Sequence, residues 1–169
     1  MSKRFIIRDK LLSLRGRIEV TDAEDFLAYE AVGEFALFRP TWHVYRDGTE
    51  VATITRRLFS WSPSWDIASQ LGNFTITRKL FSWTPGYCVS SGSFTDLRIS
   101  GSLWDMSFQI LRDEKLIAAA RGKWMSLRNA QVIELLSNDA ADELLTIIAM
   151  MLLHLDKKHE AGISAGSGD

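Results

Sequence analysis

The sequence predicts a mainly β protein: a closed antiparallel barrel of about twelve strands, made of six hairpin repeats wrapped around a buried, apolar carboxy-terminal helix. Three observations predict this fold. A ten-residue segment returns after 22 residues, the three prolines follow nearly the same spacing, and one apolar segment near the carboxyl end has no polar face. The chain has 169 residues, of which 46% are hydrophobic and 24% are charged, as expected for one globular domain.

The repeat is clearest in two segments of ten residues. Residues 52–61 (ATITRRLFSW) return as residues 74–83 (FTITRKLFSW), and eight of the ten positions are identical. Weaker copies follow the same frame at residues 7–14, 34–38 and 120–127. Alternating, β-branched and aromatic residues favour strands, so each unit predicts one hairpin of two short strands.

The prolines support the same frame independently. Pro40, Pro63 and Pro85 lie 23 and 22 residues apart, and each stands two positions from an aromatic residue on either side. Because proline fixes φ and has no N–H to donate, it belongs at a turn and not inside a ladder of strands. Six hairpins over residues 4–136 give about twelve strands, which should close because open sheet edges favour aggregation.

A helix is predicted at about residues 139–158. Ser137, Asn138 and Asp139 offer residues that can cap its first turn, and Asp142 and Glu143 stand where the helix dipole favours anions. Ten of the twelve residues from 144 to 155 are apolar, and no polar stripe remains. A helix that is apolar all round must be buried on all sides, and in a chain of this length only the barrel lumen can bury it.

The carboxyl end of this helix is expected at Lys157, Lys158 and His159, where the helix dipole favours cations. Residues 1–158 are thus predicted to form a single domain, and residues 159–169 a disordered tail. The apolar segment is shorter than the roughly 20 residues that a membrane span needs. The basic start of the chain is interrupted too early for a signal peptide, so we expect a cytoplasmic protein.

Residues that could support catalysis or bind a metal are isolated in the sequence. His43, His154 and His159 have no second ligand at a metal-binding spacing, and Cys88 has no basic neighbour that would activate its thiol. Twenty basic and twenty-one acidic residues give a net charge of −1, which argues against nucleic-acid binding. We therefore expect no enzyme activity, no catalytic residue, no metal and no cofactor.

The basic and aromatic residues of the repeats are the feature that indicates binding. Strict strand alternation puts the aromatic residues on the same face as the threonines, which would point outward beside basic side chains. A β-bulge at each basic pair would instead turn the aromatic residues into the core, and six tryptophans around a helix favour this second arrangement. The candidate lipid-headgroup residues are Arg56, Arg57, Arg78 and Lys79, and the candidate interface aromatics are Phe59, Trp61, Phe81 and Trp83.

Several motifs follow one another in a fixed order between residue 5 and about residue 157. They include residues 7–16 (IRDKLLSLRG), residues 19–22 (EVTD), the repeated Leu-Phe-Ser-Trp units and residues 101–104 (GSLW). This set resembles the LURP-one-related family, which is related to the tubby-like and phospholipid scramblase-like proteins. The resemblance implies a barrel around a central hydrophobic helix. Tubby proteins bind phosphoinositides through basic residues on the barrel surface, and scramblases are associated with lipid movement.

Two functions of different classes remain open. The first is a non-enzymatic module that binds anionic phospholipid or phosphoinositide headgroups, which would make the protein peripherally membrane-associated. The basic pairs and the family resemblance motivate this function. The second is a soluble scaffold or protein–protein interaction domain without lipid binding, motivated by the lack of any catalytic or metal-binding constellation. Neither function involves nucleic acid or a transmembrane span.

Overall fold

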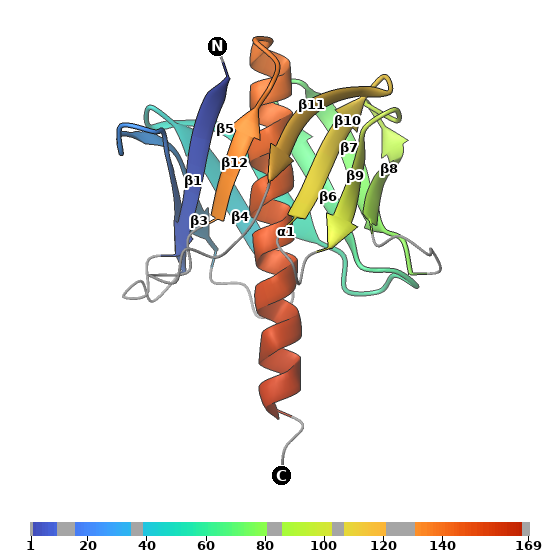
Figure 1. Ribbon diagram of the computed structural model, residues 1–169. Coiled ribbons are helices and arrows are strands. Elements are labelled where there is room, and N and C mark those ends of the chain that lie inside the picture. The colour runs from blue at the N-terminus through green and yellow to red at the C-terminus, as the bar shows by residue number, and fades with distance from the viewer. Residues whose placement is uncertain are drawn as a thin grey trace.

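The structure is a computed structural model that describes residues 2–9, 16–34, 39–80, 86–102, 107–120 and 131–166. Over these residues the chain forms twelve strands and one helix (Figure 1). The strands are β1 (Lys3–Asp9), β2 (Arg17–Thr21), β3 (Leu27–Gly33), β4 (Thr41–Arg46), β5 (Thr49–Arg56), β6 (Ser64–Ser69), β7 (Gly72–Arg78), β8 (Gly86–Gly92), β9 (Arg98–Ser102), β10 (Ser107–Arg112), β11 (Lys115–Ala120) and β12 (Gln131–Leu135), and the helix is α1 (Ala140–Gly166).

The twelve strands form one closed barrel. Each strand pairs with the next along the chain, and β1 closes the barrel by pairing with β12. All of these pairings are antiparallel, and Ile6 of β1 lies between Thr21 of β2 and Val132 of β12. The predicted closed barrel of hairpins is confirmed. Closure satisfies the backbone of both terminal strands, which would otherwise be exposed sheet edges.

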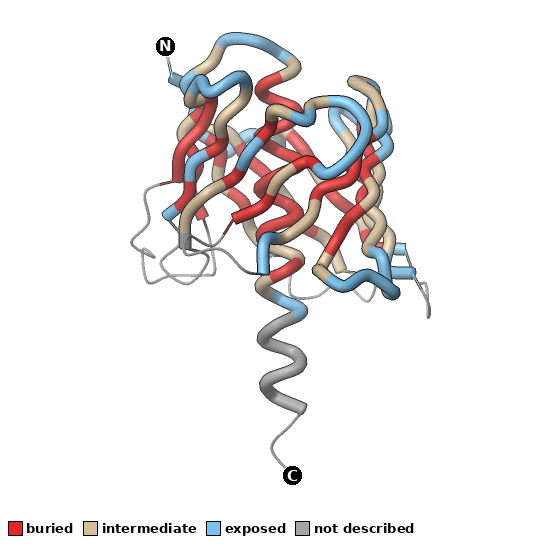
Figure 2. The backbone as a smooth tube through the Cα atoms, turned by 90° about the vertical axis from the view of Figure 1, so that its right-hand side faces the viewer, coloured by how far each residue is buried: buried red, intermediate tan, exposed pale blue. Residues whose placement is uncertain are grey.

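Side chains alternate between the lumen and the outer surface of the barrel. In β5, Ile54 is buried in the core, while its neighbours Thr53 and Thr55 lie on the outer face and are half-buried. Figure 2 shows buried segments along the strands and exposed segments mainly at the turns. The threonines of the repeat therefore point outward, as strand alternation predicts.

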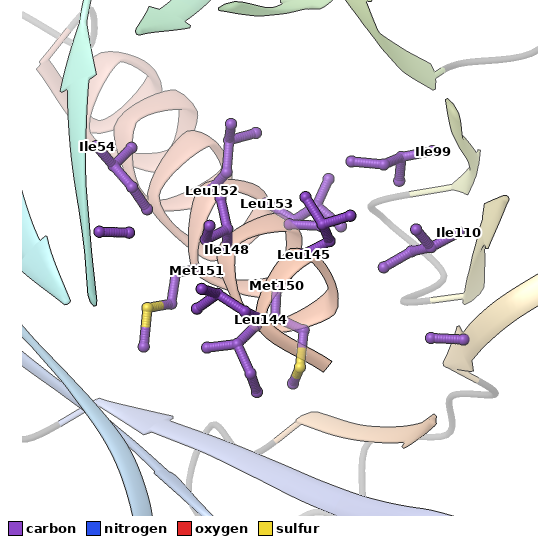
Figure 3. Packing of buried hydrophobic residues seen from close by; sticks show 14 of the residues in the cluster. Ile54, Ile99, Ile110, Leu144, Leu145, Ile148, Met150, Met151, Leu152 and Leu153 are labelled. Atoms are coloured by element: carbon purple, nitrogen blue, oxygen red, sulfur yellow. The ribbon is translucent and has the colours of Figure 1, made fainter. Parts of the chain in front are cut away.

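Helix α1 runs through the lumen of the barrel (Figure 1). All residues from Leu144 to Leu153 are buried, including Thr146, and seven of them are fully inaccessible to solvent. In Figure 3 the apolar side chains of α1 point in several directions, with Ile54 on one side of the helix and Ile99 and Ile110 on another. The buried central helix is confirmed, because the surrounding strands cover every face of this apolar segment.

The end of the barrel where α1 begins, which we call the cap end, carries a paired set of charges. Asp139 caps the helix through a 2.8 Å hydrogen bond from the Ala141 N–H to its Oδ1. One turn later, the buried carboxylate of Glu143 accepts hydrogen bonds from Lys3 Nζ at 2.7 Å and from the Tyr29 hydroxyl at 2.8 Å. The helix start is thus tied to strands β1 and β3, as the predicted cap and acidic first turn require.

The charge state of Glu143 follows from these contacts. Burial raises the pKa of the Glu143 carboxyl, but the hydrogen bonds from Lys3 and Tyr29 and the charge of Arg46 outweigh it, so the pKa lies below its ordinary value. The guanidinium of Arg46 also lies 5.3 Å from the centroid of the Tyr29 ring. Glu143 is therefore an ionised anchor for the helix.

The opposite end of α1 differs from the prediction. The helix ends at Gly166 and not near residue 158, so Lys157, Lys158 and His159 lie before its last turns. The physical reason is that no proline interrupts residues 159–166 and that Glu160 and Ala161 are good helix formers. Residues 167–169 of the predicted tail lie outside the described residues. The end where α1 leaves the barrel, next to Pro40, Pro63 and the ends of β5 and β7, is called the exit end here.

Candidate functional site

The two basic pairs of the repeat reach the exit end, but each pair divides between the two faces of the barrel. Arg56 pairs with Trp65 and Arg78 pairs with Tyr87, and both aromatic partners are buried in the core. Directly paired residues point to the same face of a sheet, so Arg56 and Arg78 point toward the lumen. Arg57 lies on the outer face. The four predicted headgroup residues therefore do not form one continuous patch.

Arg78 is engaged inside the barrel. Its Nη1 donates to Oδ2 of Asp156 at 3.3 Å, and the Tyr87 hydroxyl donates to the same oxygen at 2.6 Å. Asp156 belongs to α1 and is 2% exposed. A carboxylate at this depth is stable only when it is paired and hydrogen-bonded. Arg78 therefore joins α1 to the barrel wall and is not an outward-facing headgroup ligand.

Arg57 forms an ion pair on the outer surface. Its Nε lies 2.9 Å from each carboxylate oxygen of Asp66, and its Nη2 lies 2.7 Å from Oδ1. The hydrogen bond from Arg57 holds the pKa of the Asp66 carboxyl below its ordinary value. Thr75 also donates to Asp66, at 2.9 Å. Arg57 thus stabilises the face formed by β5, β6 and β7. Lys79, the fourth predicted headgroup residue, lies beyond the end of β7 and is exposed.

Phe59 and Trp61 are completely exposed, at 100% and 103% of their reference surfaces. The favoured inward arrangement is therefore wrong for these two residues. Strand β5 ends at Arg56, and its pairing with β6 continues without a bulge. Both aromatic residues lie in the loop of residues 57–63, where strand alternation no longer applies. The predicted partners Phe81 and Trp83 lie outside the described residues.

Hydrogen bonds hold the loop of residues 57–63 against its neighbours. The Arg57 N–H donates to the Ser64 carbonyl at 2.9 Å, and the Arg78 N–H donates to the Pro63 carbonyl at 2.9 Å. The Ser62 hydroxyl also donates to the carbonyl of Arg78. The exposure of the two aromatic rings is therefore built into a connected loop at the exit end. This loop is called the aromatic loop below.

A cavity of about 210 Å³ lies inside the exit end, between α1 and the wall formed by β4, β5 and β6. Its apolar lining comes from Pro40 and from four side chains of the wall and the helix, which are Trp42, Ile54, Trp65 and Leu155. Its charged and polar lining comes from Arg56, Asp156, Lys158 and His159. Leu155, Lys158 and His159 share one helix face by their spacing of three and four residues. The cavity therefore combines a hydrophobic wall with charged and polar side chains.

Arg56 is the distinctive residue of this cavity. Its side chain is half-buried, and within the part of the chain that the structure describes its guanidinium has no hydrogen-bond or ion-pair partner. The Asp156 carboxylate also lines the cavity but is bound by Arg78 and Tyr87. An arginine with open donors at the mouth of an apolar cavity can bind an anion with a forked pair of hydrogen bonds.

Sequence reasoning identified Arg56 but missed most of the cavity. Trp42, Trp65 and Leu155 come from segments far apart in the chain, and the helix was expected to fill the lumen. One usable signal was present, because Leu155, Lys158 and His159 form a mixed apolar and cationic face at helical spacing. Among the described residues, no group of three or more His, Cys, Asp or Glu side chains could hold a metal ion. Over the same residues, no helix has the length and hydropathy needed to cross a membrane.

These features define a class of protein: a closed twelve-stranded barrel with an apolar helix through its lumen. The chain belongs to the LURP-one-related family, whose sequence model matches residues 3–154. An X-ray structure of a protein from Arabidopsis thaliana is similar to it, with a TM-score of 0.59 and 15% sequence identity over 94% of this chain and 91% of that chain. At this identity the likeness shows the fold alone. A search of curated proteins finds no match. The family and the tubby-like fold that the sequence predicted are confirmed.

Proposed function

We propose that the chain is a non-enzymatic binding module that docks on anionic membrane surfaces through the exit end of its barrel. The observation that carries this proposal is the complete exposure of Phe59 and Trp61 beside the exposed cations Arg57 and Lys79. Exposed rings of this size are unfavourable in water. Aromatic side chains at the level of lipid headgroups bury their apolar surface, and nearby cations attract anionic lipid.

The contacts of the cations predict how the free energy of membrane binding divides between the aromatic rings and the basic side chains. Arg57 is already paired with Asp66, so its attraction for a membrane is partly cancelled. A basic residue near an anionic surface contributes about 1 kcal/mol, and salt screens this contribution over about 8 Å at physiological ionic strength. The aromatic loop therefore supplies most of the binding free energy, and Lys79 supplies a smaller, salt-dependent part.

Vesicle co-sedimentation tests this proposal. The parent protein is mixed with phosphatidylcholine vesicles with and without phosphatidylserine, at low and high salt. The double variant Phe59→Ser/Trp61→Ser should bind anionic vesicles at least about tenfold more weakly than the parent. The variant Phe26→Ser removes a 70% exposed ring from the cap end and is the matched control, which should bind like the parent.

Two results would overturn the proposal. If the parent does not bind anionic vesicles, membrane docking fails, and the alternative of a protein-interaction domain that inserts Phe59 and Trp61 into a partner takes its place. If the Phe26 and Phe59/Trp61 variants lose binding equally, the exit end is not the docking surface. Thermal melting of each variant verifies that the barrel is intact, because all three side chains are exposed and contribute little to the core.

A further inference from the structure

We infer that the cavity at the exit end binds the hydrocarbon chain of an anionic amphiphile, with the anionic head on Arg56. This inference goes beyond membrane docking, because the ligand enters the barrel and can come from solution as a fatty carboxylate or from a membrane as a lipid. The shared chemistry is one acyl chain with a negative head. The arguments are the apolar lining, the position of the open guanidinium and the size of the cavity.

The lining selects hydrocarbon over water. Trp42, Ile54 and Trp65 form a continuous apolar wall on β4, β5 and β6, because Trp42 pairs with Ile54 and Trp65 lies beside Arg56 on the same inner face. Leu155 faces this wall from α1. A water molecule needs two to four polar partners, which such a wall does not supply. A methylene chain matches the wall and gains from leaving water.

The charges select a negative head. Arg56 is the next inward position after Ile54, so its side chain lines the cavity on the exit side of the apolar wall. The negative charge of Asp156 is already bound by Arg78 and Tyr87 and does not neutralise Arg56. A carboxylate or phosphate can accept the forked hydrogen bonds of the guanidinium without displacing a protein partner among the described residues.

The size limits the ligand to a single chain. The cavity holds about 210 Å³, less than the roughly 300–1,000 Å³ of pockets that enclose drug-sized ligands. A sterol or both chains of a phospholipid would not fit. Lys158 and His159 at the mouth are exposed, so a chain can enter from the exit end while its head stays near solvent.

Calorimetric titration with sodium decanoate below its micelle concentration tests the site. The parent should bind decanoate, and Arg56→Gln should weaken binding at least about tenfold, as expected for the loss of hydrogen bonds to a charged group. Arg57→Gln is the matched control: it removes the same charge one residue away, on the outer face, and should bind decanoate like the parent. Decyltrimethylammonium, which has an alkyl chain of nearly the same length and the opposite charge, should bind at least about tenfold more weakly than decanoate.

A second variant tests the chain subsite. Leu155→Trp adds volume to the cavity from the helix side and should abolish decanoate binding, while a melting curve reports whether the barrel has folded. If this variant does not fold, a series from hexanoate to decanoate on the parent replaces it, and affinity should rise with each added methylene. Absence of decanoate binding, equal losses in the Arg56 and Arg57 variants, or affinity independent of chain length would each overturn the inference.

The two proposals fail separately. The Phe59→Ser/Trp61→Ser variant should bind decanoate like the parent, since neither residue lines the cavity. A parent that binds anionic vesicles but not decanoate would overturn the cavity inference alone. A parent that binds decanoate but not vesicles would overturn membrane docking alone, and would make a fatty carboxylate in solution the source of the ligand.

Discussion

The cap end and the exit end of the barrel use their charges in opposite ways. At the cap end, Lys3 and Arg46 both contact Glu143, and the guanidinium of Arg112 lies 2.8 Å from Asp142. At the exit end, Arg78 is paired with Asp156, but Arg56 stands without a partner among the described residues beside a cavity. Paired charges fix where α1 sits, whereas the open charge beside apolar surface is the feature on which we base the inferred ligand site.

Among the described residues, the exit end also exposes more aromatic surface than the cap end. The cap end exposes Phe26 and Leu27 beside the turn between β2 and β3. The exit end exposes Phe59 and Trp61 in full, and Leu58 is about half exposed in the same loop. A stable barrel does not require these rings to face water. The cap end therefore holds the helix, and the exit end carries the features on which the proposed binding function rests.

The largest effect is expected from a substitution in the buried helix α1, which runs from the cap end to the exit end. Ile148 is fully buried in the middle of the apolar segment 144–153 of α1, so Ile148→Asp should prevent folding. Burying an unpaired carboxylate costs several kcal/mol against a typical stability of about 5–15 kcal/mol. Soluble expression and far-UV circular dichroism report the outcome. Val132→Asp, at a residue that is 47% exposed on β12, is the control and should fold. A cooperative melt of the Ile148 variant near the parent temperature would contradict the buried helix.

At the cap end, replacing a buried, paired carboxylate should change the free energy of unfolding more than replacing an exposed one. Glu143→Gln should lower the free energy of unfolding by about 2 kcal/mol, because it weakens charge-assisted hydrogen bonds from Lys3 and Tyr29, and Lys3 is largely exposed. Urea unfolding at pH 7 measures this change. Glu24→Gln, at an exposed residue of the same end, should change it by less than about 0.5 kcal/mol. Equal changes in the free energy of unfolding of both variants would contradict an anchoring role for Glu143.

The same carboxylate should give the cap end a dependence on acid pH. The pKa of Glu143 is lower in the folded protein than its ordinary value of 4.5, so the unfolded state takes up the proton first as pH falls. The stability contributed by Glu143 is therefore complete well above pH 4.5 and is lost as pH falls through the folded pKa. Glu143→Gln should flatten the stability profile in this window, measured by unfolding from pH 6 to pH 3. Parallel profiles for parent and variant would contradict the assignment.

The smallest expected effects are changes in the free energy of unfolding when one arginine at each end is replaced. Arg46→Gln removes an ion pair with Glu143 and a contact with the Tyr29 ring, and should cost about 1 kcal/mol. Arg56→Gln removes a side chain without a partner among the described residues, and should change the free energy of unfolding by less than about 0.5 kcal/mol. Parallel urea titrations measure both. If the Arg56 variant is as destabilised as the Arg46 variant, Arg56 has a structural role and the contrast between the ends fails.

Much of the fold could be predicted because its signals are local. The return of Thr-Ile-Thr-Arg after 22 residues and the regular prolines report hairpins without any knowledge of their neighbours. The unbroken apolar surface of residues 144–153 requires burial on all sides, and closure of the strands supplies it. The direction of Thr53 and Thr55 also follows from alternation, because β5 is regular from Ala52 to its last residue.

The candidate site could be predicted only in part. Arg56 and Trp61 stand five positions apart in one repeat, but the end of β5 between them decides that one points inward and the other into solvent. The residue at which β5 ends depends on its pairing with β6, and no local sequence pattern predicts this pairing. The sequence also predicts the end of the helix near residue 158, whereas α1 continues to Gly166, since favourable cations do not stop a helix that continues in good helix formers.

Residue patterns alone therefore determine the hairpin frame, the closed barrel and the central helix, because each depends on periodicity and on the need to bury apolar surface. The tertiary structure decides which charges are paired and where space remains. Asp156 reaches Arg78 and Tyr87, which leaves Arg56 open beside Trp42 and Leu155. These side chains come from distant strands and from the helix, and their distances are set only when the barrel closes around α1.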